Sequence, residues 1–300
     1  MSTVPPPYRQ LVDDAAIFPP GNAPLSEAVA AHLRHRAAGY ADLVGGFVVS
    51  DVKLPDLISE VGKAGSPGPL AVNVVVTGGA GAIEPAVRWA LDEALDLRAV
   101  EVALRDEADL AHNARRMVTV VDQLRTAGTL ADEVLVHVEP PPPRDAPGPG
   151  WLGALDEVAA LDLRLKFRTG GASADSFPSA AALAACISAA LDHELAFKCT
   201  AGLHHPVRHT DDATGFEHHG FLNVLLATRA SLDGATIEET AAVLEQRDPA
   251  AVRDLVEQHG PDALASARRW FTSFGSCSVL EPLEDLVELA LLPHELLENR

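Results

Sequence analysis

The sequence predicts a closed (β/α)8 TIM barrel that forms a single domain over residues 1–300. Short β-rich segments alternate eight times with amphipathic segments, which is typical of a parallel sheet built from βα units. No Gly-x-Gly-x-x-Gly turn follows the first expected strand, and no second half restarts the pattern. A closed barrel is therefore favoured, with an open sheet that has two edge strands as the alternative.

The eight units follow one another along the chain with few interruptions. The expected strands are 10–18, 46–50, 70–77, 99–104, 133–139, 164–169, 195–200 and 270–276. The expected helices are 26–44, 54–63, 83–93, 107–125, 152–161, 178–191, 221–232 and 282–291.

Local signals support these boundaries. Ser26 is expected to cap the first helix, and Pro178 suits the first turn of the sixth. A proline-rich loop at 140–150 and a helical insertion at roughly 234–262 interrupt the pattern. The insertion is expected to hold two helices, 236–246 and 249–258, before the eighth strand. Neither interruption has the length or polarity of an interdomain linker.

Composition limits the classes of partner. The chain has 43 acidic and 23 basic residues, a formal charge of −20, so binding to nucleic acid is not expected. No signal-peptide run occupies the first ten residues, and no uncharged apolar run of membrane-spanning length was identified. We therefore expect a cytoplasmic protein with a small-molecule substrate, no cofactor and no membrane partner. Whether it forms a homo-oligomer is left open.

The three cysteines predict no covalent or metal framework. Cys186, Cys199 and Cys277 are far apart and lack Cys-x-x-Cys spacing, so a disulfide framework or a zinc ribbon is not expected. Burial is the expected environment for all three.

Strand alternation gathers polar side chains on one side of the expected barrel wall. Residues of equal parity share a face, so Arg164, Lys166 and Arg168 lie together. The same reasoning groups further residues of neighbouring strands, namely Asn73, Glu101, His137, Glu139, Lys198 and Thr200. Burying such a set for structure alone is costly, and the carboxyl ends of barrel strands are where active sites form. The alternative is that some of these side chains point outward or pair with one another at the rim.

The lysines on strands six and seven are the leading candidates for carbonyl chemistry. Lys166 and Lys198 lie about one βα unit apart, so their ammonium groups are expected to be neighbours. Two close ammonium groups in a partly dry site lower each other's pKa. One amine would then be neutral near pH 7, and a neutral lysine is a nucleophile for carbonyls.

Three segments resemble deoxyribose-phosphate aldolase and the wider class I aldolase group. The chain reads Lys-Phe-Arg-Thr-Gly at 166–170, Phe-Lys-Cys-Thr-Ala-Gly at 197–202 with Val-Arg at 207–208, and Phe-Gly-Ser-Cys-Ser at 274–278. These correspond to the family motifs of strands six, seven and eight. Val-Glu-Val at 100–102 and Leu-Val-Asp at 11–13 are similar to its fourth and first strands.

The resemblance implies a role for each matching residue. Lys166 would form the Schiff base, Lys198 would lower its pKa, and Glu101 would move protons where the family uses aspartate. Residues after strands six to eight would bind an anionic group of the substrate, which backbone amides and hydroxyls suit: Thr169, Gly170, Gly171, Thr200, Gly202, Arg208, Gly275, Ser276 and Ser278. Asp13 would belong to the same site.

Three departures from the family pattern alter the expected substrate. Arg168 replaces a small hydroxyl residue, Glu101 is one methylene longer than aspartate, and His204-His205-Pro206 replaces a tight glycine turn. The substrate is therefore not expected to be deoxyribose phosphate. A guanidinium beside the lysine favours a carboxylate or a second phosphate on the substrate.

Other titratable residues leave further roles open. His204, His205, His209, His218 and His219 crowd one segment, and histidine is a common metal ligand. Their spacing matches no helix-borne metal motif, so we expect no metal site and a mobile loop, 203–220, that brings His204 or His205 to the substrate. Idle solvated histidines are the alternative.

Two pairs of neighbouring residues also bear on the site. Alternation sends only one of Asp13 and Asp14 inward. His137 and Glu139 could form an acid–base pair or a structural pair.

Three functions are consistent with the sequence. The first is a carbon–carbon lyase of the aldolase type that uses a Schiff base on a small anionic carbonyl compound. The second is a metal-dependent hydrolase or isomerase that uses the loop histidines. The third is a barrel without catalytic activity that serves as a binding protein.

Overall fold

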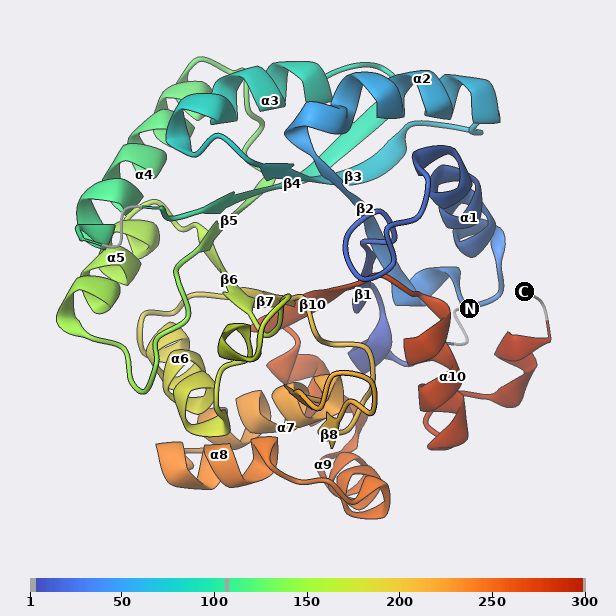
Figure 1. The fold of residues 1–300 in the computed structure, drawn as a ribbon, viewed down its shortest axis with the longest axis vertical. Helices are drawn as coiled ribbons and strands as arrows, with labels where there is room; N and C mark the ends of the chain where they lie inside the picture. Colours follow the sequence, from blue (N-terminus) through green and yellow to red (C-terminus); the bar gives the residue numbers. More distant parts are fainter. Residues whose placement is uncertain (1–3, 106–107, 299–300) are drawn as a thin grey trace.

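The computed structural model describes residues 4–105 and 108–298 and shows a closed barrel of eight parallel strands (Figure 1). Around the barrel the strand order is β1-β10-β7-β6-β5-β4-β3-β2. The bounds are β1 Val12–Asp14, β2 Val44–Ser50, β3 Leu70–Val76, β4 Leu95–Ala103, β5 Leu135–Glu139, β6 Arg164–Arg168, β7 Phe197–Thr200 and β10 Phe271–Ser276. Because β1 pairs with both β2 and β10, the sheet has no edge. The predicted (β/α)8 barrel is confirmed and the open sheet is excluded.

Helices surround the barrel on the outside (Figure 1). Their bounds are α1 Leu25–Ala37, α2 Leu54–Ala64, α3 Ile83–Ala90, α4 Leu110–Thr126, α5 Pro149–Ala159, α6 Ala180–Asp192, α7 Phe221–Leu232, α8 Ile237–Leu244, α9 Pro249–Ala267 and α10 Leu280–Glu288. Apolar strand residues such as Val72, Val74 and Val76 are buried in the core. Alternation therefore leaves the opposite strand faces, which line the barrel interior, free to carry polar side chains.

Several expected boundaries at the start of the chain were wrong. The first helix begins at Leu25, and Pro24 rather than Ser26 is its N-cap. It ends at Ala37 because Ala38 is extended, and β2 already begins at Val44. β1 spans only Val12–Asp14, since Ala15 onward forms a loop closed by the bond from Ala23 N to Ala16 O.

Later boundaries differ for similarly local reasons. Pro178 lies before α6, whose N-cap is Ser179; the Ser179 hydroxyl accepts a hydrogen bond from the amide of Ala182. Ser and Thr hydroxyls satisfy helix N-termini in this way. The fourth helix is described from Leu110, and Glu107, its expected first residue, lies outside the described residues.

Two helices occupy the region of the expected insertion. Thr236 and Glu239 form a capping box at the start of α8. α9 continues to Ala267 and is broken at Gly260, which has a positive φ. α8 contacts α6 and α7, and α9 contacts α7, so both add to the outer layer of the barrel. The loop after β7 contains a short hairpin that was not expected, β8 His209–Thr210 with β9 Glu217–His218.

One segment of the described chain, Ala174–Asp192, is long and apolar enough to cross a membrane by composition. It includes α6, and half of its most apolar stretch is buried inside the protein. Core helices of globular domains also have this composition.

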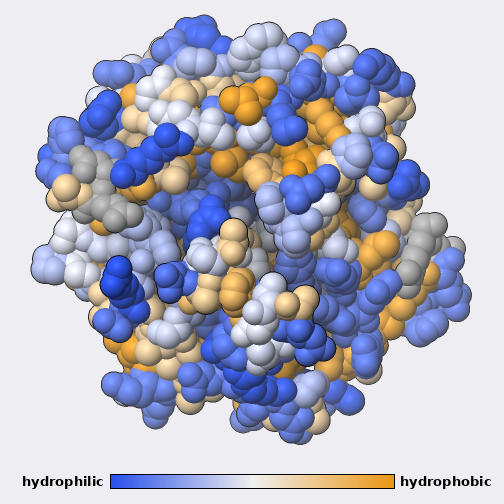
Figure 2. All heavy atoms as spheres, viewed as in Figure 1, coloured by the Kyte–Doolittle hydropathy of each residue, from blue (hydrophilic) through white to orange (hydrophobic). Residues whose placement is uncertain are grey.

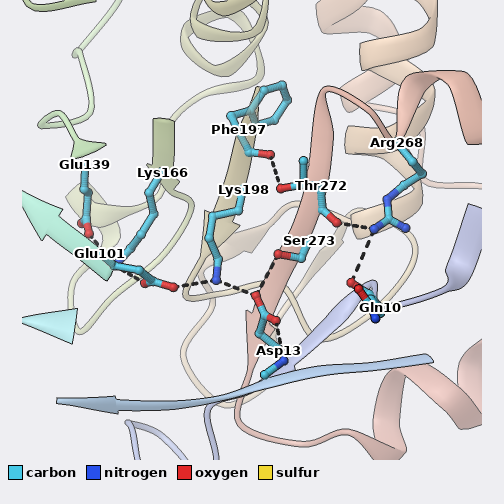
Figure 3. A network of polar contacts seen from close by, with 11 residues as sticks. Gln10, Asp13, Glu101, Glu139, Lys166, Phe197, Lys198, Arg268, Thr272 and Ser273 are labelled. Carbon is cyan, nitrogen blue, oxygen red and sulfur yellow. Dashed lines mark hydrogen bonds and ion pairs between the residues drawn. The ribbon is translucent and has the colours of Figure 1, made fainter. Parts of the chain in front are cut away.

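The amino-terminal end of the barrel is fastened by Arg268. Its Nε donates to the carbonyl of Phe271 and its Nη1 to the carbonyl of Pro7, while Nη2 donates to the carbonyl of Thr272. Figure 3 shows this guanidinium between Thr272 and Gln10. One side chain therefore connects the N-terminal segment to β10.

We predict that Arg268→Met lowers the free energy of unfolding by about 2 kcal/mol, since several half-buried carbonyls lose a charged donor. Chemical denaturation monitored by circular dichroism measures this. The neighbouring Arg269 is exposed, so Arg269→Met should change stability by less than about 0.5 kcal/mol. Equal effects of the two substitutions would contradict the role given to Arg268.

Candidate functional site

Strand register places two lysines side by side inside the barrel. Lys166 of β6 and Lys198 of β7 are paired in register, and on the next two strands of the barrel Glu101 of β4 pairs with His137 of β5. All four side chains are buried. Figure 3 shows both lysines pointing toward Glu101. The two lysines are thus neighbours inside the barrel, as predicted.

Glu101 bridges the two ammonium groups. Its Oε1 lies 2.7 Å from Lys198 Nζ, and its Oε2 lies 2.9 Å from Lys166 Nζ. The Glu101 side chain is only 2% exposed. Each carboxylate oxygen therefore has its own cation, an arrangement in which neither charge is left unpaired in the barrel.

Asp13 completes the environment of Lys198. Its Oδ2 lies 2.5 Å from Lys198 Nζ and accepts a hydrogen bond from the Ser273 hydroxyl at 2.8 Å. Its Oδ1 accepts one from the Gly46 amide at 3.1 Å. Contacts from β7, β10 and β2 thus hold this carboxylate in place. Asp14 points the other way, with Oδ2 2.9 Å from His32 Nδ1 of α1, as alternation required.

Glycine at position 45 makes room for Asp13. A Cβ added there would lie 2.2 Å from Asp13 Oδ1, so any side chain would displace the carboxylate. At Gly46 a Cβ would lie 2.8 Å from Asn73 Oδ1. Sequence reasoning missed Gly45, Gly46 and Ser273. The available signal for a close approach was the glycine pair at the start of the second expected strand, where Gly46 is its first residue and Gly45 directly precedes it.

Glu139 connects Lys166 to the rim of the barrel. Its Oε2 lies 2.9 Å from Lys166 Nζ, and its Oε1 accepts a hydrogen bond from Arg168 Nε at 2.8 Å. The Arg168 side chain is 40% exposed. A continuous chain of charges therefore runs from solvent at Arg168 to Lys198 in the interior, and three carboxylates balance three cations along it: Asp13, Glu101 and Glu139 with Lys166, Lys198 and Arg168.

The expected lowering of a lysine pKa was wrong for this arrangement. Burial would lower the pKa of Lys166, but Glu101 and Glu139 outweigh it and raise the pKa above its ordinary value. Burial would also lower the pKa of Lys198, but the charges of Asp13 and Glu101 outweigh it, so that this pKa is raised as well. Because carboxylates separate the ammonium groups, attraction dominates over the lysine–lysine repulsion on which the expectation relied.

The same pairing acts on Glu101. Burial would raise its pKa, yet the charges of Lys166 and Lys198 hold the pKa well below the ordinary value. Glu139 behaves in the same way toward Lys166 and Arg168. In the unliganded barrel both lysines are therefore cationic and these glutamates are anionic.

His137 is the unpaired member of the interior. Both ring nitrogens are buried without a hydrogen-bond partner among the described residues. Burial first, and then the charge of Lys198, lower its pKa to about 3. Neither the acid–base pair nor the structural pair considered for His137 and Glu139 forms, because Glu139 is engaged by Lys166 and Arg168. His137 is thus a neutral imidazole beside the charged network.

Residues after β6 and β7 pack closely against one another. Thr169 is fully buried, and its hydroxyl donates to the carbonyl of Ala201 at 2.6 Å. A Cβ at Gly170 would lie 2.8 Å from Gly202 Cα, and one at Gly171 would lie 2.7 Å from the Ser176 side chain. Gly202 has φ of +75°. These positions therefore need glycine for close packing, and binding of an anion by them stays a prediction.

The predicted residues after β10 serve partly to begin α10. The Ser276 side chain accepts a hydrogen bond from the amide of Ser278, and the Ser278 side chain accepts one from the amide of Glu281. Gly275 is in register with Thr200 and Asp13. Binding of an anion by Gly275, Ser276, Ser278 and Thr200 stays a prediction.

The histidine-rich loop is fastened to surrounding helices. His204 Nδ1 lies 3.0 Å from Glu281, and His205 Nδ1 lies 2.7 Å from Asp285, both on α10. Arg208 pairs with Glu217 at 3.3 Å and lies 3.1 Å from His219 Nδ1. Direct contact of these side chains with substrate stays a prediction.

The remaining loop histidines face backbone carbonyls: His209 that of Val207, His218 that of Gly202, and His219 that of Pro178. Across residues 4–105 and 108–298, no group of three or more His, Cys, Asp or Glu side chains is arranged to hold a metal ion. The loop geometry therefore lends no support to the metal-dependent alternative.

We predict that Glu101→Gln destabilises the fold at pH 7 by about 3–5 kcal/mol, because two buried ammonium groups lose a shared partner. The pKa of Glu101 is depressed in the folded state, so its contribution is complete above the unfolded value of about 4.3 and is lost as pH falls below it. Denaturation between pH 7 and 3 should show a smaller loss of stability for the variant than for the wild type.

Glu84 is the matched control for this pH series, since its side chain is 51% exposed in an i,i+4 pair with Arg88. Glu84→Gln should keep the wild-type pH dependence. A Glu101→Gln series parallel to the wild type would show that Glu101 is not held ionised by the lysines.

Comparison with known proteins assigns neither a family nor an activity to the chain. No protein-family model and no curated protein matches the chain. Among solved structures, the HMG-CoA lyase from Brucella melitensis aligns over 88% of this chain and 97% of its own, at 12% identity and a TM-score of 0.39. A likeness at this level supports no assignment of activity. The fold class rests on the strand order of the chain itself, a closed (β/α)8 barrel.

Proposed function

We propose that the protein is a carbon–carbon lyase that forms a Schiff base between Lys166 and a small carbonyl compound carrying an anionic group. The observation that carries this proposal is the position of Lys166 Nζ, 2.9 Å from both Glu101 and Glu139 and in register with Lys198. A nucleophilic amine needs an adjacent base to accept its proton. Lys166 has two such bases within hydrogen-bond distance.

Lys166 suits the nucleophile better than Lys198 does. The carboxylate that pairs with Lys198, Asp13, is held by Ser273 and the Gly46 amide in addition. Glu139 pairs with Lys166, and among the described residues its second oxygen is shared only with the half-exposed Arg168. If an anionic substrate attracts Arg168 away from Glu139, a path opens from the rim to Lys166, whereas Lys198 stays enclosed.

The reaction then follows from proton transfers within the network. Glu101 or Glu139 takes a proton from Lys166, and the neutral amine attacks the carbonyl carbon. The carbonyl oxygen gains two protons in all and leaves as water, so that a protonated imine forms. As the bond between the carbons α and β to the imine breaks, its electron pair forms an enamine. The hydroxyl on the β carbon gives its proton to a carboxylate of the network, and that fragment leaves as a second carbonyl compound. Protonation of the enamine and hydrolysis of the imine return the free lysine.

Lys198 supports these steps as a fixed positive charge. Its ammonium group holds Glu101 ionised until a proton arrives from Lys166. Moving that proton onto Glu101 replaces one ion pair by a neutral pair and leaves the Lys198–Asp13 pair in place. The network can therefore accept a proton without leaving an unpaired charge in the barrel.

Arg168 favours a carboxylate or phosphate on the substrate. Its Nε donates to Glu139, and the side chain is 40% exposed, so part of the guanidinium is accessible from solvent. A planar guanidinium binds carboxylate and phosphate oxygens in a bidentate manner. The anionic group would lie at the rim, with the carbonyl carbon directed toward Lys166.

A barrel without catalytic activity is the second candidate. The network is charge-balanced, as a purely structural set of ion pairs would be. Against this, buried ion pairs generally stabilise a fold no better than apolar residues of similar volume. Stability of the fold therefore does not by itself explain two buried lysines in the barrel interior. The catalytic and the non-catalytic candidates predict different results in a trapping experiment.

The test is borohydride reduction in the presence of a panel of small aldehydes and keto acids, followed by intact mass measurement and peptide mapping. The chain has four lysines, Lys53, Lys63, Lys166 and Lys198, so the modified residue is readily assigned. We predict a reduced adduct on Lys166 with at least one compound. Lys166→Arg should abolish it, since a guanidinium keeps the charge but forms no imine.

Two further variants complete the trapping experiment. Lys198→Met should slow adduct formation tenfold or more, through the loss of the charge that orients Glu101. Lys63, which is exposed, is the matched control, and Lys63→Arg should react as the wild type does. No adduct with any compound, or an adduct that persists in a folded Lys166→Arg protein, would reject the proposed chemistry.

A further inference from the structure

A thiol, an imidazole and a carboxylate meet where β10 ends. Cys277 Sγ lies 3.9 Å from His204 Nδ1 and 4.0 Å from His204 Nε2. His204 Nδ1 also lies 3.0 Å from Glu281 Oε2. The three side chains come from the end of β10, from the loop after β7 and from α10, so only the folded chain brings them together.

Local structure fixes the carboxylate of this group. The Ser278 hydroxyl caps the first turn of α10 by accepting a hydrogen bond from the Glu281 amide, which sets Glu281 over His204. Burial would lower the pKa of His204, but hydrogen bonds with Cys277 and Glu281 raise it to about 9. His204 is therefore an imidazolium at neutral pH, and it carries a proton beside the sulfur of Cys277.

The other two cysteines differ in both burial and charge environment. Cys186 and Cys199 are buried, and burial raises the pKa of each thiol, to about 12 for Cys186. Cys277 is only half-buried. The chain thus contains two internal controls for the reactivity of the third thiol.

The surroundings of Cys277 limit what can reach it. The loop that follows β1 passes directly over it, and a Cβ at Gly21 would lie 2.9 Å from Cys277 Cβ. This loop, residues 15–24, carries no charged side chain. The charged and titratable groups near His204 are Glu281 and Asp285 of α10 and the histidines at 205, 209 and 218.

We propose that Cys277, His204 and Glu281 form a reactive-thiol site, distinct from the lysine network, at which small neutral hydroperoxides oxidise the Cys277 sulfur. Small size follows from the cover over the thiol. Neutrality follows from the formal charge of −20 and from the nearby carboxylates, which repel anionic reagents.

The chemistry needs only the thiolate, the imidazolium and the peroxide. Cys277 Sγ attacks one peroxide oxygen, so that an S–O bond forms as the O–O bond breaks. The sulfur is oxidised by two electrons and the peroxide is reduced. The departing hydroxide, or the alkoxide of an organic hydroperoxide, takes a proton from His204 and leaves as water or an alcohol, and Cys277 is left as the sulfenic acid.

The test treats the native, reduced protein with equimolar hydrogen peroxide at pH 7, traps sulfenic acid with dimedone and maps the label by peptide mass. We expect the label on Cys277 and none on Cys186 or Cys199 until the protein is unfolded. His204→Gln should slow labelling of Cys277 tenfold or more. Glu281→Gln should also slow it, since the imidazolium loses the carboxylate that stabilises it.

Two controls separate this site from its surroundings. His209 lies in the same loop, and no contact between it and Cys277 is found among the described residues. In the His209→Gln protein, Cys277 should be labelled at a rate within twofold of the wild-type rate. Cys277→Ser should lose the label yet keep borohydride trapping at Lys166, so the two proposals fail independently. Label on Cys186 or Cys199 would reveal a variant that has unfolded.

Two outcomes would overturn the proposal. One is a native wild-type protein in which Cys277 stays unlabelled while unfolded protein is labelled. The other is a folded His204→Gln protein that labels at the wild-type rate, which would show that the imidazolium does not activate the thiol.

Discussion

The Glu101 carboxylate is the interaction on which the barrel interior depends. It lies between two ammonium groups that would otherwise face each other in a space closed to water. With Asp13 and Glu139 beside it, every charge in the interior is compensated. Removing water from charges is expensive, so this compensation determines whether two lysines can occupy a barrel core at all. It also sets the resting protonation state, because each carboxylate raises the pKa of the lysine it contacts.

That resting state gives the proposed chemistry a particular form. The lysine is not poised as a free amine but as half of an ion pair whose partner can take its proton. An anionic substrate that engages Arg168 would weaken the hold of Arg168 on Glu139 and so change the balance at Lys166. Substrate binding and activation of the nucleophile would then be the same electrostatic event. The fixed end of the network, Asp13 with Ser273 and Gly46, would stay unchanged throughout.

The polar groups of the histidine-rich loop contact the elements around the loop, whereas those of the lysine network contact one another inside the barrel. Figure 2 shows the face of the molecule on which the loop lies. Its histidines and Arg208 contact α10, the β8–β9 hairpin and backbone carbonyls, so most of its polar groups already have partners. Asn223 at the start of α7 strengthens this by accepting a hydrogen bond from the Arg208 amide and donating to the carbonyls of Val243 and Gln246. The loop therefore joins the helical insertion to the barrel mouth, and it places His204 beside Cys277.

The sequence by itself determined the barrel and the grouping of Lys166, Lys198 and Glu101, because periodicity of two and the repeat of βα units are local properties. It left open which of Asp13 and Asp14 points inward. It could not determine which carboxylate stands between which cations. That depends on the stagger between strands distant in sequence, such as β1 beside β10. For this reason the direction of the lysine pKa shift, the isolation of His137, the room that Gly45 leaves for Asp13 and the meeting of Cys277 with His204 were decided only by the tertiary structure.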